Sequence, residues 1–195
     1  MGFYERRILP HVINKACGTK PIDYQRRKVV PAAEGVVLEI GIGTGLNLPY
    51  YDTNKVTRLI GLDPSEESWV LAGERAQALP FDVEFVGLPG EEIPLEAKSV
   101  DTVLVTYSLC TIPDPVKALE GMRRVLKPGG QFIFTDPMQW DDCPADVLQP
   151  ILDRIHLATL GSPGFYDKEL KALGFEKLGF DDHVDQLRRH YWRVR

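Results

Sequence analysis

Residues 38–47, LEIGIGTGLN, decide the fold of this chain. They complete a short apolar run, residues 35–41, that predicts a buried strand, and a helix can follow them. The glycines at positions 41, 43 and 45 allow a tight turn and let a ligand come close to the backbone. Leu46 stands where a GxGxxG dinucleotide-binding loop has its third glycine, so the spacing here is GxGxG. The stretch predicts a cofactor-binding loop, with a tight turn that holds no ligand as the alternative.

Two acidic residues accompany this loop. Asp63 ends the next apolar run, residues 56–63, and in a doubly wound sheet the ends of these adjacent strands open onto one crevice. A carboxylate there can accept hydrogen bonds from the hydroxyls of a ribose, or it is simply an acid at a helix start. Glu39 comes shortly before the first glycine. A carboxylate there is unfavourable beside a pyrophosphate and favourable beside a ligand that carries an ammonium and a sulfonium. The alternative is that Glu39 simply pairs with a nearby cation. Together they favour S-adenosylmethionine over NAD.

The rest of the chain alternates strand-like and helix-like segments. Further strands are predicted at 83–88, 99–108 and 129–137, the last of them entered through the KPGG turn. Helical spacing covers residues 3–16, 23–31, 65–78, 115–126, 145–160 and 167–173. Two late strands are predicted at 175–180 and 190–195. Strands that alternate with helices indicate a parallel sheet covered on both faces.

Composition excludes several classes of protein. The chain has 195 residues, of which 44% are hydrophobic and 26% charged, as in a single soluble domain. A net charge of −5 argues against a nucleic-acid partner. No apolar run is long enough to span a membrane. Three distant cysteines and no secretory leader suggest reduced thiols in a cytoplasmic protein, and the histidine spacing predicts no metal site.

Residues 35–137 resemble class I S-adenosylmethionine-dependent methyltransferases, through LEIGIGTGLNLPYY, EEIPLE, SLCTIPDP and RRVLKPGG. Residues 1–137 resemble in particular the small methyltransferase-11-type proteins of the thiol and phospholipid methyltransferase-like group. Residues 135–195 resemble sarcosine/dimethylglycine N-methyltransferases of glycine betaine synthesis, through TDPM, LQPILDRIHL, LGSPGFY and HYWRV. The resemblance implies one domain, 1–195, with a Rossmann-like seven-stranded fold and a mostly parallel doubly wound sheet. Residues 1–32 would form an N-terminal lid, and residues 138–173 an acceptor-side helical segment.

The resemblance also implies site residues. Glu39, Gly41 and Gly43 would line the methionine part of the cofactor, Asp63 the ribose, and Ser108 and Leu109 the reacting sulfur. Gly90 and Glu91 would lie near the adenine, although Leu88 and Pro89 stand where many relatives carry an aspartate for the adenine amino group. The remaining expected site residues are Gly45 and Asn47 for the cofactor, Tyr107 or His156 as a general base, and Met138, Arg154 and Tyr166 for the acceptor.

The function expected from these features is methyl transfer from S-adenosylmethionine to a small amine such as sarcosine or dimethylglycine. A methyltransferase for a thiol or a phospholipid head group is the first alternative. A cofactor-binding module without turnover is the second alternative, and it belongs to another class. The missing third glycine counts against an NAD-dependent reductase. Oligomeric state is left open by the sequence.

Overall fold

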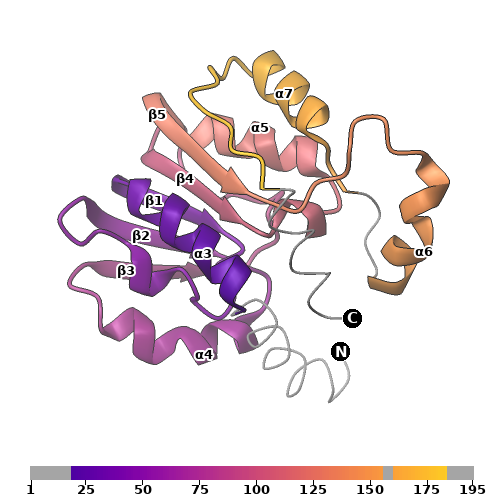
Figure 1. Cartoon of the computed structure of the whole chain (residues 1–195). Coiled ribbons are helices and arrows are strands. Elements are labelled where there is room, and N and C mark those ends of the chain that lie inside the picture. Colours follow the sequence, from indigo (N-terminus) through magenta and orange to yellow (C-terminus); the bar gives the residue numbers. More distant parts are fainter. Residues whose placement is uncertain (1–18, 156–159, 184–195) are drawn as a thin grey trace.

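A computed structural model describes residues 19–155 and 160–183. Five parallel strands form one sheet in the order β3–β2–β1–β4–β5 (Figure 1). The strands are β1 Gly35–Ile40, β2 Val56–Leu62, β3 Asp82–Val86, β4 Val100–Thr106 and β5 Leu126–Thr135. The predicted parallel α/β sheet is therefore confirmed. The described residues contain five of the seven strands expected for the fold.

Within the described ranges, five helices and three short 3₁₀ turns accompany the sheet. The helices are α3 Lys20–Val29, α4 Glu66–Gln77, α5 Pro115–Val125, α6 Ala145–Ile155 and α7 Pro163–Ala172. The 3₁₀ turns are η1 Val30–Ala32, η2 Leu48–Tyr50 and η3 Leu109–Thr111. Ser65, Asp114 and Ser162 cap α4, α5 and α7, each by accepting a hydrogen bond from a backbone N–H three residues later.

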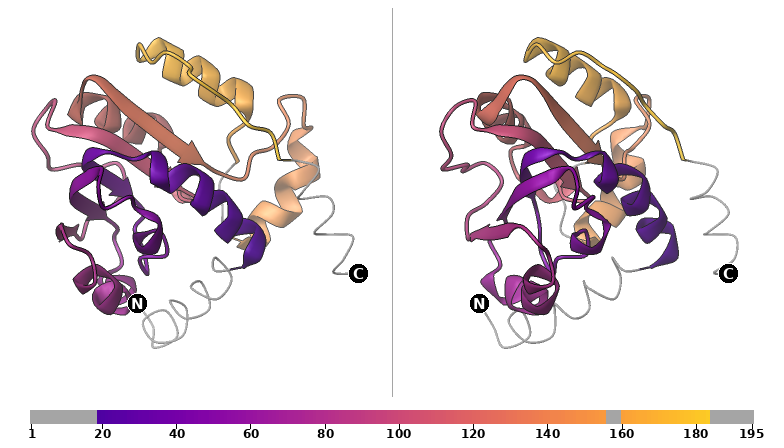
Figure 2. Two further views of the ribbon diagram at one scale, coloured as in Figure 1. Left: turned by 60° about the vertical axis from the view of Figure 1, so that its left-hand side comes forward. Right: turned by 90° about the vertical axis from the view of Figure 1, so that its left-hand side faces the viewer.

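The alternation of side chains along β1 builds two separate cores. Leu38 and Ile40 point into a core shared with α5 and α7, whereas Val37 points into a core shared with α3, α4 and η2. Figures 1 and 2 show α3 lying across the sheet on the side opposite α5. Glu39 shares its side of β1 with Val37, so its carboxylate is buried under α3 and needs polar partners there.

Three sequence-based boundaries need correction. Residues 175–180 form no strand, because Leu178 and Phe180 point into solvent and no described strand pairs with them. The KPGG segment lies inside β5 as an irregularity of the ladder between β4 and β5, with Gly129 at φ +77°, and is not a turn before the strand. Helix α7 begins at Pro163, four residues before the predicted start.

Several predicted features lie outside the described residues. They are the helix over 3–16 with most of the proposed lid, the strand at 190–195, and residues 156–159 of the helix predicted over 145–160. Among the described helices, none has both the length and the apolar character that crossing a bilayer requires.

Candidate functional site

The carboxyl ends of the strands form one continuous edge, and most of the predicted site residues lie along it. The glycine loop follows β1, Asp63 follows β2, Tyr107 follows β4 and Asp136 follows β5. Backbone hydrogen bonds join neighbouring ends, from Gly41 N to Leu62 O (2.7 Å) and from Tyr107 N to Thr135 O (2.7 Å). The strand order reverses between β1 and β4, which is where ligands bind in open α/β sheets.

The three glycines of the loop have different surroundings, although all have positive φ. A side chain on Gly41 would collide with the Ser108 hydroxyl. One on Gly45 would lie 2.7 Å from Leu48 and 2.8 Å from Ala72. One on Gly43 would meet no described atom closer than 3.8 Å, where Asp63 Oδ2 lies. Gly41 and Gly45 therefore allow the loop to pack, whereas Gly43 faces a space that a ligand can occupy.

Asp63 connects the glycine loop to the start of α4. Its Oδ2 accepts a hydrogen bond from Gly43 N (3.0 Å), and its Oδ1 accepts one from Ser65 N (2.8 Å). Burial raises the pKa of this carboxyl, and the two backbone N–H groups partly oppose that rise. Each oxygen keeps a second lone pair for a ligand hydroxyl. The helix-start role and the ribose role are thus compatible in one residue.

Glu39 and Asn47 belong to a buried polar network between α3 and the strand ends. Glu39 accepts hydrogen bonds from Asn47 Nδ2 (2.8 Å) and from the Tyr51 hydroxyl (2.6 Å). Arg26 donates to Asn47 Oδ1 (2.6 Å) and to Thr106 Oγ1 (2.8 Å). Burial raises the pKa of Glu39 to about 7, while Tyr51, Arg26 and Asn47 pull it down. We call these five residues the Arg26–Glu39 network.

The network accounts for Glu39 without a ligand. Both carboxylate oxygens already have donors, and the residue is only 1% exposed. The sequence analysis allowed for a cation near Glu39, and Arg26 is such a cation. Arg26 acts on Glu39 through its charge and is linked to it through Asn47. Glu39 therefore lies at the end of β1, on the side of the sheet that α3 covers, and holds Asn47 of the glycine loop in place. Asn47 is fully buried in the same layer.

Tyr107 and Ser108 follow β4 and lie next to the glycine loop. Tyr107 adopts φ +58°, which is unusual for a residue with a side chain, and the Arg26 guanidinium lies 5.5 Å from the centre of its ring. Ser108 donates a hydrogen bond to Thr106 O (3.1 Å) and fills the space beside Gly41. Leu109, which follows in η3, is buried in the core under α5.

Gly90 and Glu91 lie on the loop after β3. A side chain on Gly90 would lie 2.6 Å from Ile112 and 3.3 Å from Ile40, so this position needs glycine for packing. Glu91 Oε1 accepts a hydrogen bond from Asp114 N (3.2 Å), whereas its Oε2 is buried without a partner among the described residues. The structure places both residues near the edge of the site, and Glu91 keeps one acceptor unused.

The predicted acceptor residues divide into two groups. Tyr166 of α7 lines a cavity of about 160 Å³ between η3 and α7, together with Leu109, Cys110, Ile112, Gln139 and Phe165. Met138 packs against the core cluster that also contains Tyr166. Arg154 lies on α6, but its side chain is outside the described part, as is His156 altogether.

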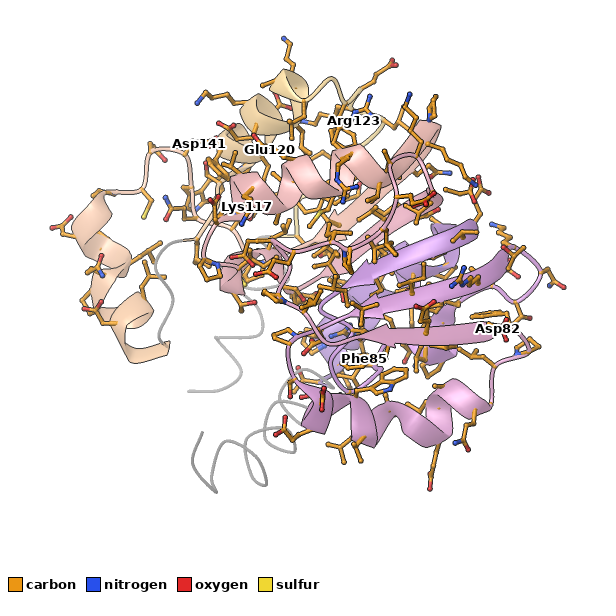
Figure 3. The ribbon with its side chains drawn as sticks, turned by 180° about the vertical axis from the view of Figure 1, so that it is seen from behind. Asp82, Phe85, Lys117, Glu120, Arg123 and Asp141 are labelled. Carbon is orange, nitrogen blue, oxygen red and sulfur yellow. The ribbon has the colours of Figure 1, made fainter. Side chains whose placement is uncertain are left out.

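The segment after β5 is fixed to α7. Asp141 Oδ1 accepts a hydrogen bond from Gly164 N (2.8 Å), and Gln139 N donates to Gly161 O (3.0 Å). Figure 3 shows Asp141 beside the start of α7, whereas Lys117, Glu120 and Arg123 lie along α5. Helix α6 stands on the side toward which the strand arrowheads point (Figures 1 and 3). The acceptor-side segment thus borders the same edge as the glycine loop.

Asp136 is a candidate site residue that the sequence analysis did not select. It comes directly after β5, and both of its carboxylate oxygens are buried without a hydrogen-bond partner of ordinary geometry among the described residues. Burial raises its pKa to about 7, although the thiol and N–H of Cys110 and the N–H of Leu109 lower it in part. The TDPM motif indicates its position at a strand end, but the structure is needed to show that the carboxylate is buried and has no positively charged partner among the described residues.

The chain belongs to the class I S-adenosylmethionine-dependent methyltransferases. Residues 38–134 match the family model described as a methyltransferase domain. The sequence is 42% identical over 164 residues to sarcosine/dimethylglycine N-methyltransferase of Halorhodospira halochloris, covering 83% of this chain and 59% of that protein. It is 30% identical over 134 residues to phosphatidylethanolamine N-methyltransferase of Cereibacter sphaeroides, covering 68% of this chain and 64% of that protein.

A solved structure supports the same fold. A candidate sarcosine dimethylglycine methyltransferase from Galdieria sulphuraria superposes with a TM-score of 0.76 at 26% identity, over 95% of this chain and 68% of that chain. The chain spans less than two thirds of the length of both curated relatives. The 164 residues aligned with the Halorhodospira enzyme also extend well beyond the C-terminal third. The sequence division into two differently related parts was therefore too sharp.

Proposed function

We propose that this chain binds S-adenosylmethionine along the edge formed by the glycine loop, Asp63 and Ser108. It then directs the methyl group to the nitrogen of a small amino acid of the sarcosine or dimethylglycine type. The observation that carries the proposal is the space beside Gly43. This space is bounded by the Asp63 carboxylate and lies at the point where the strand order reverses.

The residues present fit this cofactor. Gly43 leaves the space beside it open, and Asp63 offers acceptors for the ribose hydroxyls. Glu91, on the loop after β3, has a further acceptor in Oε2. The bound cofactor supplies a methyl group that is already electrophilic because it sits on a positively charged sulfur. The protein then has to orient the acceptor and exclude water, and such orientation can contribute roughly 7–11 kcal/mol.

The acceptor class follows from the likeness to sarcosine/dimethylglycine N-methyltransferases and from the cavity beside Tyr166. Its rings, Tyr166 and Phe165, lie 5.2 Å apart at an interplanar angle of 71°. Aromatic faces favour methylated ammonium groups. A phospholipid head group is the second candidate, because the chain also resembles a phosphatidylethanolamine N-methyltransferase.

The test is release of S-adenosylhomocysteine from S-adenosylmethionine by the full chain, with sarcosine, dimethylglycine or dispersed phosphatidylethanolamine as acceptor. Cofactor binding is first measured by calorimetry. We expect turnover with sarcosine or dimethylglycine. Turnover only with the phospholipid would replace the amino-acid acceptor. Cofactor binding without turnover on any of the three would favour a module that does not methylate these acceptors.

A further inference from the structure

The carboxylate of Asp136 lacks a positive partner. Both oxygens are buried, and the Cys110 thiol and the N–H groups of Cys110 and Leu109 approach them outside ordinary hydrogen-bond geometry. No ion pair joins Asp136 to a described cation. The titratable groups that act on it are the Cys110 thiol on η3 and the Tyr166 hydroxyl on α7, and neither carries a positive charge. Buried carboxylates are usually paired or hydrogen-bonded, so this one is suited to a cation that arrives from outside.

Asp136 also lies next to the proposed methyl-transfer edge. Its neighbour Thr135 accepts the hydrogen bond from Tyr107 N, and Ser108 touches the glycine loop at Gly41. One strand end therefore separates Asp136 from the loop. Cys110 and Tyr166, which act electrostatically on Asp136, both line the cavity between η3 and α7. A group held in that cavity would lie beside Cys110 and Tyr166, the two residues whose side chains act on the Asp136 carboxylate.

We propose that Asp136 binds the ammonium group of the acceptor and takes its proton before methyl transfer. This inference rests on the proposed function. The proton moves from the acceptor nitrogen to an Asp136 oxygen, and the freed lone pair forms the new nitrogen–carbon bond. The carbon–sulfur bond breaks, its electron pair stays on sulfur as a neutral thioether, and Asp136 later returns the proton to water. Asp136 would then be a catalytic residue in place of Tyr107 or His156.

The environment of Asp136 suits both the binding of the ammonium group and the transfer of its proton. Because burial raises its pKa to about 7, the carboxyl is a stronger proton acceptor than an exposed aspartate and is charged above that pH. The aromatic groups near it, Phe134 and Tyr166, have ring centres 5.2 Å apart, and they suit the methyl groups of a partly methylated nitrogen.

The test compares two ligands that differ in charge and hardly in shape. Glycine betaine carries a trimethylammonium group, and 3,3-dimethylbutyrate carries a neutral tert-butyl group in its place. Each is titrated into the full chain saturated with S-adenosylhomocysteine, at pH 8, by calorimetry. We expect betaine to bind at least tenfold more tightly than the neutral analogue. Asp136→Asn should weaken betaine binding about ten- to a hundredfold and leave the neutral analogue unaffected, since the attraction between the carboxylate and the trimethylammonium charge is lost.

Asp142→Asn is the matched control, because Asp142 is an exposed carboxylate six residues further along the same segment. It should bind both ligands as the natural chain does. A second measurement needs no variant: betaine affinity should rise as the pH increases through about 7, because Asp136 ionises there, while the affinity for the neutral analogue stays level. No preference for betaine, or unchanged betaine binding by Asp136→Asn, would overturn the cation site.

Turnover separates this inference from the proposed function. If the natural chain methylates sarcosine or dimethylglycine and Asp136→Asn does so at an equal rate, the role of Asp136 is wrong and the function stands. If no amine is methylated, the function and the proton transfer both fail, and the betaine titration alone decides whether Asp136 binds cations.

Discussion

Replacing Arg26 by methionine should destabilise the fold by an amount that depends on pH. Methionine keeps much of the side-chain volume but removes the hydrogen bonds to Asn47 Oδ1 and Thr106 Oγ1. Thr106 keeps a bond from Asn47 Nδ2, so one buried acceptor loses its partner. Such a group costs about 1–3 kcal/mol, and this part of the loss is independent of pH.

The remaining loss comes from Glu39, whose folded-state pKa is about 7 against an ordinary value of 4.5. Because the folded-state pKa is raised, the folded state holds the proton longer than the unfolded state, and stability falls as pH rises from about 4.5 to 7. Arg26 limits this fall, since it favours the charged carboxylate. Without Arg26 the pKa of Glu39 rises further, and the fall continues above pH 7. We therefore expect a loss of about 1–3 kcal/mol at pH 5.5 and about 3–5 kcal/mol at pH 9.

Urea denaturation followed by tryptophan fluorescence at the two pH values measures this difference. Groups that titrate equally in both proteins cancel when the variant is compared with the natural chain. Arg27→Met is the matched control, because Arg27 is the next residue on α3, is largely exposed and pairs with Asp23. It should show little loss and no increase with pH. An equal loss for Arg26→Met at pH 5.5 and pH 9 would refute the coupling between Arg26 and Glu39.

Three further substitutions test the glycine loop and its surroundings. Asp63→Ala should weaken S-adenosylmethionine binding about ten- to a hundredfold in calorimetry, while Asp82→Ala, an exposed carboxylate at the opposite edge of the sheet (Figure 3), should not. Equal affinities would remove Asp63 from the ribose role. Gly43→Val should abolish cofactor binding in a chain that still folds, as judged by circular dichroism, because its side chain would fill the open space beside Asp63. Retained binding would make the loop purely structural. Gly41→Ala should lower stability by about 1–3 kcal/mol in urea, because its methyl group collides with Ser108, and Ser108→Gly in the same chain should recover part of that loss. A loss that Ser108→Gly leaves unchanged would show that the positive φ of Gly41 is the whole cause.

The sheet could be predicted from the sequence because its signals are local. Each of the five strands is a short apolar run bounded by turn residues, and the glycine loop marks the first strand end. The same local signal wrongly predicts a strand over residues 175–180, which also form a short apolar run. Phe175 packs against Phe132 (ring centres 5.6 Å apart), whereas Leu178 is 84% exposed. Its apolar residues do not face one common surface, and a strand also needs a partner that local sequence cannot supply.

The polar part of the site was less predictable. Glu39 and Asp63 stood out because they flank the glycine loop. Arg26 did not stand out, because its partners lie 21 and 80 residues away in the sequence. Asp136 belongs to the TDPM motif, yet a single acidic residue after a strand does not indicate whether its carboxylate faces water. Asp136 is of interest because its carboxylate is buried and has no positively charged partner among the described residues, and both are properties of the folded chain.

The position of Arg26 has a consequence for how the chain acquires its fold during synthesis. Helix α3 leaves the ribosome before any strand, but the guanidinium that anchors it reaches Thr106 only after 80 further residues have been made. Until β1 and β4 lie side by side, hydration is better for this cation than burial, so α3 has no polar reason to dock. A nascent chain that ends before Thr106 should therefore leave α3 open to proteases. Protection should appear abruptly once the fourth strand is in place.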